Sequence, residues 1–126
     1  MATADDYKKD IVRKMKSVGT YNISFQHSID VLSRTLYDYE IAVKNFESSG
    51  SHIIVKHTNK NGSTNVVKNP LYLAIEKLRD DVLSYSRELG LTPAGLKRIN
   101  EQGMTPEKKS KFEEFLSAKT EARKGS

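Results

Sequence analysis

The chain has 126 residues and no cysteine, and 21 Lys and Arg residues against 16 Asp and Glu residues give a net charge of +5. This length predicts one domain. The lack of cysteine excludes disulfides, a thiol nucleophile and Cys-ligated metal sites. No apolar run approaches the roughly 20 residues that cross a bilayer, and the N-terminus lacks the apolar core of a signal peptide. We therefore expect a soluble intracellular protein with no membrane contact, metal or cofactor.

The positive charge is concentrated at both ends of the chain and in one middle segment. Residues 1–20 hold five basic and three acidic side chains, residues 51–70 hold three basic and none acidic, and residues 91–126 hold eight basic and five acidic. The two hydrophobic blocks between them are slightly acidic. This pattern indicates a nearly neutral body with basic extremities.

A first helix is predicted from about Asp5 to Val18. Asp5 and Asp6 suit the positive end of a helix dipole, and Gly19 suits the position just after a helix. One face of this helix is apolar, with Tyr7, Ile11, Met15 and Val18. The opposite face is basic, with Lys8, Lys9, Arg13, Lys14 and Lys16.

Two longer helices show heptad spacing. The first runs from about Asn22 to Ser48, with the seam Phe25, Ile29, Leu32, Leu36, Tyr39, Val43 and Phe46. The second follows Asn69 and Pro70, a capping residue and a helix-starting proline, with the seam Leu71, Ile75, Leu78, Val82, Tyr85 and Leu89. Such seams need partners along their length. The simplest arrangement is a long antiparallel helical hairpin.

A small β-hairpin is predicted at about residues 52–68, between the two long helices. Residues 53–58 are rich in β-branched side chains, Asn61-Gly62 is a strong hairpin turn signal, and residues 64–68 supply the second strand. We expect this hairpin to cap one end of the helical pair, or to be a mobile loop there.

Two short helices are predicted after Gly90. Each begins with a Thr-Pro pair, at Thr92-Pro93 and at Thr105-Pro106. The second carries an apolar strip of Phe112, Phe115 and Leu116. The chain thus divides into a basic N-terminal helix (1–20), a helical hairpin core (21–90) and a C-terminal part with short helices and a tail (91–126).

A few apolar residues fall outside the two heptad seams. Scattered surface side chains are one explanation. The other is burial between subunits, because a hairpin of two helices leaves one flank open. We favour an oligomer interface formed by Tyr37, Ile41, Leu73 and Leu83.

No catalytic or metal-binding motif is apparent. The glycines do not form a phosphate-binding loop, and His27, His52 and His57 have no metal-ligand spacing. Adjacent carboxylates such as Asp80 and Asp81 point about 100° apart on a helix, as solvated residues do. We therefore expect a protein that is not an enzyme.

Basic patches are the main candidates for function. The density of cations on the first helix suits contacts with DNA phosphates, although a solvated helix face is the simpler explanation and an acidic protein partner is equally compatible. Our first choice for DNA binding is Lys8, Lys9, Arg13, Lys14 and Lys16. The second choice is Lys56, Lys60 and Lys68 on the hairpin, with Lys97 and Arg98 after it.

Several segments match a known pattern. Residues 69–99 begin with Asn-Pro, contain Leu-Arg-Asp-Asp and leave their long helix through Leu-Gly-Leu-Thr-Pro. Val-Gly-Thr-Tyr at residues 18–21 and Phe-Glu-Ser-Ser-Gly at residues 46–50 precede them. Over about residues 7–100 the sequence resembles the small subunit of bacteriophage DNA-packaging terminases, in the group that often serves phages with cohesive ends.

The resemblance implies a non-enzymatic subunit that forms a homo-oligomeric ring of about eight to eleven copies. Such a ring would recognise the packaging site on viral double-stranded DNA in the host cell cytoplasm and bring in the large terminase subunit, which holds the ATPase and nuclease. Many members begin with a helix-turn-helix, whereas one basic helix precedes the long helix here.

The resemblance also implies that the C-terminal segment contacts the large subunit, through Phe112, Phe115 and Leu116 in this chain. Packing of these residues onto the protein's own body is the alternative. At the level of function, the alternative is a helical oligomeric adaptor protein without DNA binding.

Overall fold

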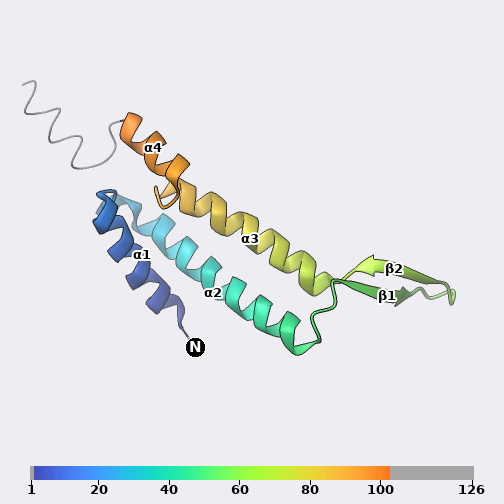
Figure 1. Cartoon of the computed structure of the whole chain (residues 1–126). Helices are drawn as coiled ribbons and strands as arrows, with labels where there is room; N and C mark the ends of the chain where they lie inside the picture. The colour runs from blue at the N-terminus through green and yellow to red at the C-terminus, as the bar shows by residue number, and fades with distance from the viewer. Residues whose placement is uncertain (1, 103–126) are drawn as a thin grey trace, which may run out of the picture.

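The computed structural model describes residues 2–102, which form a mainly helical chain with one β-hairpin (Figure 1). The elements are α1 (Ala4–Val18), a 3₁₀ turn η1 (Ile23–Phe25), α2 (Gln26–Ser48), β1 (Ile54–Thr58), β2 (Thr64–Lys68), α3 (Pro70–Glu88) and α4 (Pro93–Glu101). The mainly α fold and the small hairpin are confirmed. The helix predicted from Pro106, with Phe112, Phe115 and Leu116, lies outside the described residues.

Helices α3 and α4 begin after Asn69 and Thr92, the capping residues that the sequence indicates, and α1 begins after Thr3, slightly before the predicted Asp5. Thr3 and Asp6 form a capping box before α1, since each side chain accepts a hydrogen bond from the other's backbone N–H, at 3.2 Å and 2.9 Å. Asn69 accepts from the N–H of Leu71 at 3.0 Å, and Thr92 accepts from Gly95 at 3.1 Å. These caps satisfy N–H groups that the first helical turn leaves unpaired.

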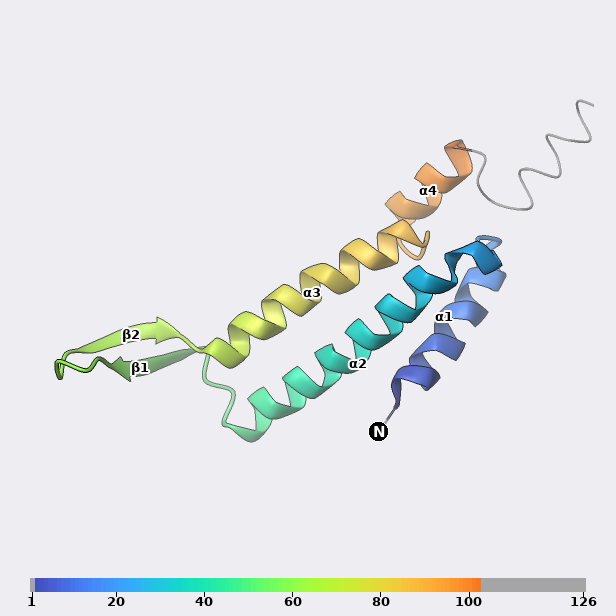
Figure 2. The ribbon, with the colours of Figure 1, turned by 180° about the vertical axis from the view of Figure 1, so that it is seen from behind.

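Helices α2 and α3 run antiparallel side by side, and α1 lies along the N-terminal half of α2 (Figures 1 and 2). At one end of the pair the rings of Phe46 and Tyr72 are 5.5 Å apart. At the other end Phe25 packs against the buried cluster that includes Leu89. The predicted antiparallel pairing of the two seams is therefore confirmed.

The core lies where three helices meet. Its buried members come from α1, α2 and the residue that caps the end of α3: Ile11, Met15, Ile29, Leu32 and Leu89. Beyond α1 the seam is still buried at Phe46 and Ile75, which are 9% and 3% exposed. Two other seam positions of α3, Leu71 at its start and Tyr85 near its end, are 39% and 37% exposed. The seam on this chain is thus only partly covered.

The hairpin pairs Ile54 with Lys68 and Thr58 with Thr64. Its turn is longer than a two-residue Asn-Gly turn, because the N–H of Asn59 bonds to the carbonyl of Ser63 at 2.8 Å. Gly62 takes the left-handed conformation that this loop needs, with φ of 88°. The hairpin is confirmed, but it projects past the ends of α2 and α3 and does not cover them (Figure 2).

Among residues 2–102, no helix combines the length and the apolar composition that crossing a bilayer requires.

Candidate nucleic-acid interface

The basic face of α1 is largely neutralised by acids of the same chain. Lys9 forms an ion pair with Asp5 at 3.3 Å. Asp10 forms ion pairs with Arg13 and with Lys14, the latter at 2.7 Å. The hydrogen bond from Lys14, followed by that from Arg13, lowers the pKa of Asp10 below its ordinary value. The side chains of these cations are still well exposed. They can meet phosphates, but only in competition with their own carboxylates.

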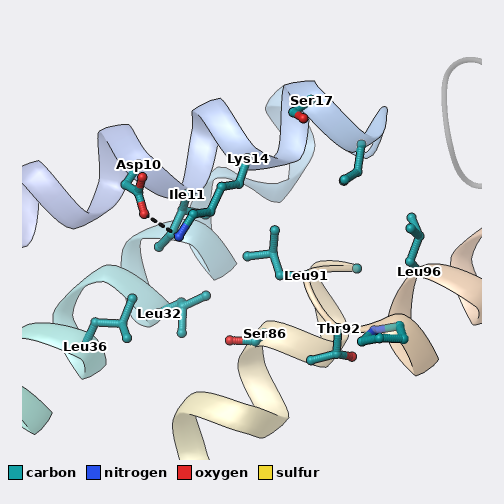
Figure 3. A pocket seen from close by; sticks show the side chains of 13 residues that line it. Asp10, Ile11, Lys14, Ser17, Leu32, Leu36, Ser86, Leu91, Thr92 and Leu96 are labelled. Atoms are coloured by element: carbon teal, nitrogen blue, oxygen red, sulfur yellow. Dashed lines mark ion pairs between the residues drawn. The ribbon is translucent and has the colours of Figure 1, made fainter.

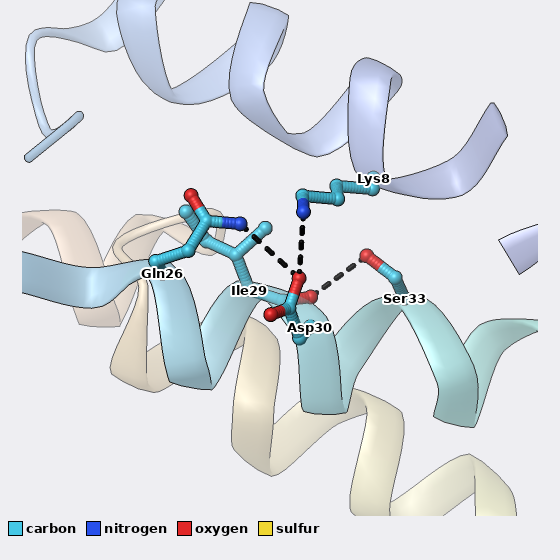
Figure 4. Close-up of polar contacts among 5 residues, drawn as sticks. All are labelled: Lys8, Gln26, Ile29, Asp30 and Ser33. Atoms are coloured by element: carbon cyan, nitrogen blue, oxygen red, sulfur yellow. Dashed lines mark hydrogen bonds and ion pairs between the residues drawn. The ribbon is translucent and has the colours of Figure 1, made fainter. Parts of the chain in front are cut away.

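Lys8 points across to Asp30 on α2 (Figure 4). Its ammonium lies 3.0 Å from the carboxylate of Asp30, which also accepts a hydrogen bond of 3.1 Å from Gln26. The bond from Lys8 is the largest cause of the lowered pKa of Asp30. Lys8 therefore fastens α1 to α2, in addition to any role toward DNA.

Lys16 differs from the other cations of α1. It has no acidic partner within the described part of the chain, and its ammonium lies 5.0 Å from the centre of the Tyr21 ring. A cation over an aromatic face keeps its full charge available. Lys16 is thus the member of the first-choice set that is most open to an anionic ligand.

The hairpin cations have a different environment. No acidic residue occurs between residues 51 and 70, and neither Lys56 nor Lys60 has an ion pair within residues 2–102. Lys68 at the base pairs with Glu76 of α3 at 2.9 Å, which raises the pKa of Lys68. The outer part of the hairpin therefore carries positive charge that no side chain of the described chain neutralises.

The third patch, on α4, is paired. Lys97 lies 3.9 Å from Glu101, and Arg98 lies 3.4 Å from Glu88 of α3. The three predicted patches are not brought together on one chain. Helices α1 and α4 lie toward one end of the helical pair, and the hairpin projects from the other (Figure 1).

The residues of the predicted oligomer interface differ in their exposure. Leu73 and Leu83 on α3 are 49% and 51% exposed, whereas Tyr37 and Ile41 on α2 are half-buried. The guanidinium of Arg34 lies 5.3 Å from the centre of the Tyr37 ring. Leu71 and Tyr85 add to the exposed apolar surface, which their heptad positions did not predict.

A groove of about 600 Å³ opens where α1 and α2 meet the junction of α3 and α4 (Figure 3). Leu32, Leu36, Leu91 and Leu96 give it apolar walls, and the Asp10–Lys14 ion pair lies at its rim. In residues 2–102 no group of three His, Asp or Glu side chains is placed to hold a metal ion. The groove therefore has the chemistry of a packing surface.

Asn69 and Glu40 hold the basic elements against the helical pair through contacts that the sequence pattern did not predict. Asn69 joins the hairpin to α3, since its side chain donates to the carbonyl of His52 and its backbone N–H to that of Ile53, both at 2.7 Å. Glu40 on α2 accepts a hydrogen bond from Tyr7 of α1. The capping role of Asn69 was visible in the sequence, but these longer-range contacts leave no periodic signal.

Comparison with known proteins gives one result. Residues 6–104, well over half of the chain, match a family model described as phage terminase, small subunit. No significant match was found among curated proteins or among solved structures.

Proposed function

Because the chain belongs to the phage terminase small-subunit family, we propose that it recognises viral double-stranded DNA at the packaging site and brings the large terminase subunit to it. Family membership supports a role in genome packaging. The observation that carries the DNA-binding part is the acid-free, basic hairpin segment at residues 51–70. The chain would act in the host cell cytoplasm, where packaging takes place.

The chemistry of packaging belongs to the partner in this proposal. Small terminase subunits are generally non-catalytic, and the ATPase and nuclease are assigned to the large subunit. The site that is offered to the large subunit is the apolar strip Phe112, Phe115 and Leu116. The alternative for this strip is packing onto the chain's own body.

Assembly into a ring of about eight to eleven copies would strengthen weak DNA contacts, because linked sites bind with a high effective concentration. The exposed side chains of Leu73 and Leu83, with Tyr37 and Ile41, support an interface between copies. Each copy would add its α1 cations, Lys8, Lys9, Arg13, Lys14 and Lys16, and its hairpin cations to one DNA molecule.

The test is DNA binding at two salt concentrations, with fluorescence anisotropy on a fragment that contains the packaging site and on a scrambled fragment. We expect binding that weakens steeply with salt and that favours the packaging site. Charge reversal of the five α1 cations to Glu measures their share. An assembled protein that binds neither fragment at low salt would establish the adaptor alternative.

Large-subunit recruitment needs a separate experiment. Immobilised chain is incubated with purified large subunit, and the variant Phe112→Ser/Phe115→Ser is compared with the unchanged chain. We expect the variant to lose retention of the large subunit while its DNA affinity is unchanged. Equal retention would assign the strip to the chain's own body.

A further inference from the structure

The hairpin has two distinct faces. Partners in an antiparallel pair point to the same side, so the register places six residues on one side, which we call the Lys56 face: Ile54, Lys56, Thr58, Thr64, Val66 and Lys68. Ile54 and Val66 are 62% and 68% exposed, whereas Val67 on the other side is 37% exposed. The Lys56 face is thus the more open one.

The charge of the hairpin is unlike that of the helices. Most cations on the helices are paired with a carboxylate of the same chain, as Lys44 is with Glu40 and Lys77 with Asp81. The hairpin holds no acid, and Lys56 and Lys60 are unpaired within the described residues. A polyanion is the ligand that such a surface complements.

The base of the hairpin is firmly held. The two 2.7 Å hydrogen bonds from Asn69 to His52 and Ile53 join the incoming segment to the start of α3. Lys68 pairs with Glu76, and its ammonium lies 5.9 Å from the centre of the Tyr72 ring. These contacts keep the two strands beyond the ends of the helices.

We infer that the hairpin enters the major groove of DNA with its Lys56 face toward the bases. This inference rests on the proposed function and assigns its groove-reading element. A major groove about 12 Å wide admits a two-stranded β-ribbon, and five residues per strand give a ribbon about 17 Å long. Lys56 and Lys60 would contact phosphates at the rim of the groove. Val66 and Ile54 are suited to thymine methyl groups, and Thr58 and Thr64 to base edges.

A second copy of the chain is the other occupant to consider, since both outer edges of the hairpin are unpaired within residues 2–102. Its own hairpin would bring the same lysines and no acid, so like charges would face each other. Lysines on edge strands also disfavour pairing between chains. DNA is negatively charged and does not pair with the strand edges, so neither the like charges nor the edge lysines oppose its binding. The charge of the hairpin therefore favours DNA over a second copy as the occupant.

The experiment combines affinity with dimethyl sulfate footprinting on packaging-site DNA. Dimethyl sulfate reads guanine N7 in the major groove and adenine N3 in the minor groove. For the unchanged chain we expect protection of guanine N7 without protection of adenine N3. The variant Lys56→Gln/Lys60→Gln is expected to bind roughly tenfold more weakly or worse, to show a shallower salt dependence and to lose the N7 protection.

A matched control removes the same charge elsewhere. The variant Lys44→Gln/Lys77→Gln alters two exposed helical lysines outside the proposed interface and should keep the footprint. A second hairpin variant, Val66→Ser, retains the charge and should lose discrimination between packaging-site and scrambled DNA by severalfold. Circular dichroism of each variant verifies the helices.

The outcomes separate the inference from the proposed function. If the unchanged chain binds DNA and Lys56→Gln/Lys60→Gln binds equally with the same footprint, the groove assignment is overturned and the proposed function stands. Protection confined to adenine N3 overturns the assignment in the same way. If hairpin variants change the subunit number and leave DNA affinity intact, the hairpin pairs with a second copy. If the unchanged chain binds no DNA, the proposed function itself fails.

Discussion

The hydroxyl of Tyr7, near the start of α1, donates a hydrogen bond to the carboxylate of Glu40 in the second half of α2. The bond is the largest cause of two opposite shifts: it raises the pKa of Tyr7 to about 12 and lowers that of Glu40. The hydrogen bond therefore contributes its full stabilisation at pH values above 4.5, the ordinary pKa of glutamate, and below 10.0, the ordinary pKa of tyrosine. It fastens the end of α1 that precedes the buried Ile11 and Met15.

Removing this bond should loosen the N-terminal turns of α1. In Tyr7→Phe the ring is retained and the donor is lost, so we expect hydrogen exchange at residues 4–10 to become roughly two- to tenfold faster. The control Tyr21→Phe changes a tyrosine that lies under Lys16 and packs against the core, with no part in the bond to Glu40, and it should leave these amides unchanged. Equal exchange in Tyr7→Phe and the unchanged chain would mean that the bond contributes nothing to holding α1.

Acid should release α1 before the rest of the core. Bonds from Lys8 and Lys14 lower the pKa values of Asp30 and Asp10 below the ordinary 3.8. The stabilisation from these two ion pairs is complete at pH values above 3.8. It is lost as the pH falls through the lowered pKa values of the two aspartates in the folded protein. Amide protection in α1, followed by NMR from pH 6 to pH 2, should fall first.

The control for the acid effect is Asp30→Asn, which lacks one titrating partner. Its α1 should be less protected at pH 6 and should depend less on pH below the ordinary aspartate value. An acid profile identical to that of the unchanged chain would remove the Lys8–Asp30 pair from the explanation.

The three-helix core should be sensitive to a cavity at Ile29, whose side chain is fully buried at 0% exposure. We expect Ile29→Ala to lower the free energy of unfolding by about 2–5 kcal/mol. Ile23, at 72% exposure, is the comparison, and Ile23→Ala should cost less than about 0.5 kcal/mol. Thermal and denaturant unfolding measure both, and similar costs for the two variants would contradict the core assignment.

Gly95 should not tolerate alanine, although alanine favours an isolated helix by about 1 kcal/mol. A Cβ at this position would lie 2.1 Å from the carbonyl oxygen of Arg87, which is backbone and has little room to yield. We expect Gly95→Ala to shift α4 away from α3 and to lower stability by about 1–3 kcal/mol. Ala94→Ser, at an exposed neighbour, is the control, and a stability gain in Gly95→Ala would disprove the close approach.

Assembly should depend on the exposed leucines of α3. Leu73→Asn/Leu83→Asn alters side chains that are half-exposed on the single chain, so the helix content should be unchanged. We expect subunit dissociation to become at least roughly tenfold more favourable, because two apolar contacts are lost per interface. Native mass spectrometry across a concentration series measures this, with Ile23→Asn as an exposed comparison. An unchanged subunit number in the double variant would place the interface elsewhere.

Most of the fold could be predicted because its signals are local. Heptad spacing located α2 and α3, and Asn69-Pro70 and Thr92-Pro93 marked helix starts that the structure confirms. The direction of the hairpin could not be predicted, because it depends on bonds from Asn69 to residues of the preceding segment. The division into residues 1–20, 21–90 and 91–126 stays a prediction.

The candidate site was harder to predict because charge alone does not show which cations are free. The spacing of Asp10 and Lys14 is that of a helical ion pair, and it offered a signal that the basic face is partly neutralised. The pairing of Lys8 with Asp30 joins two helices, and no spacing predicts it. Lys56 and Lys60 could be ranked higher only once the acids near the other cations were known.

The hydrogen bonds from Asn69 to His52 and Ile53 also limit how far the hairpin can change its orientation relative to α3. A ribbon about 17 Å long acts as a lever arm, so a swing of about 10° at its base moves the tip by about 3 Å, several times the tolerance of a positioned contact. An asparagine that touches no ligand would then govern the accuracy of recognition at the far end. Substitution of Asn69 would therefore reduce the specificity for one DNA sequence over another more than it reduced the overall affinity for DNA.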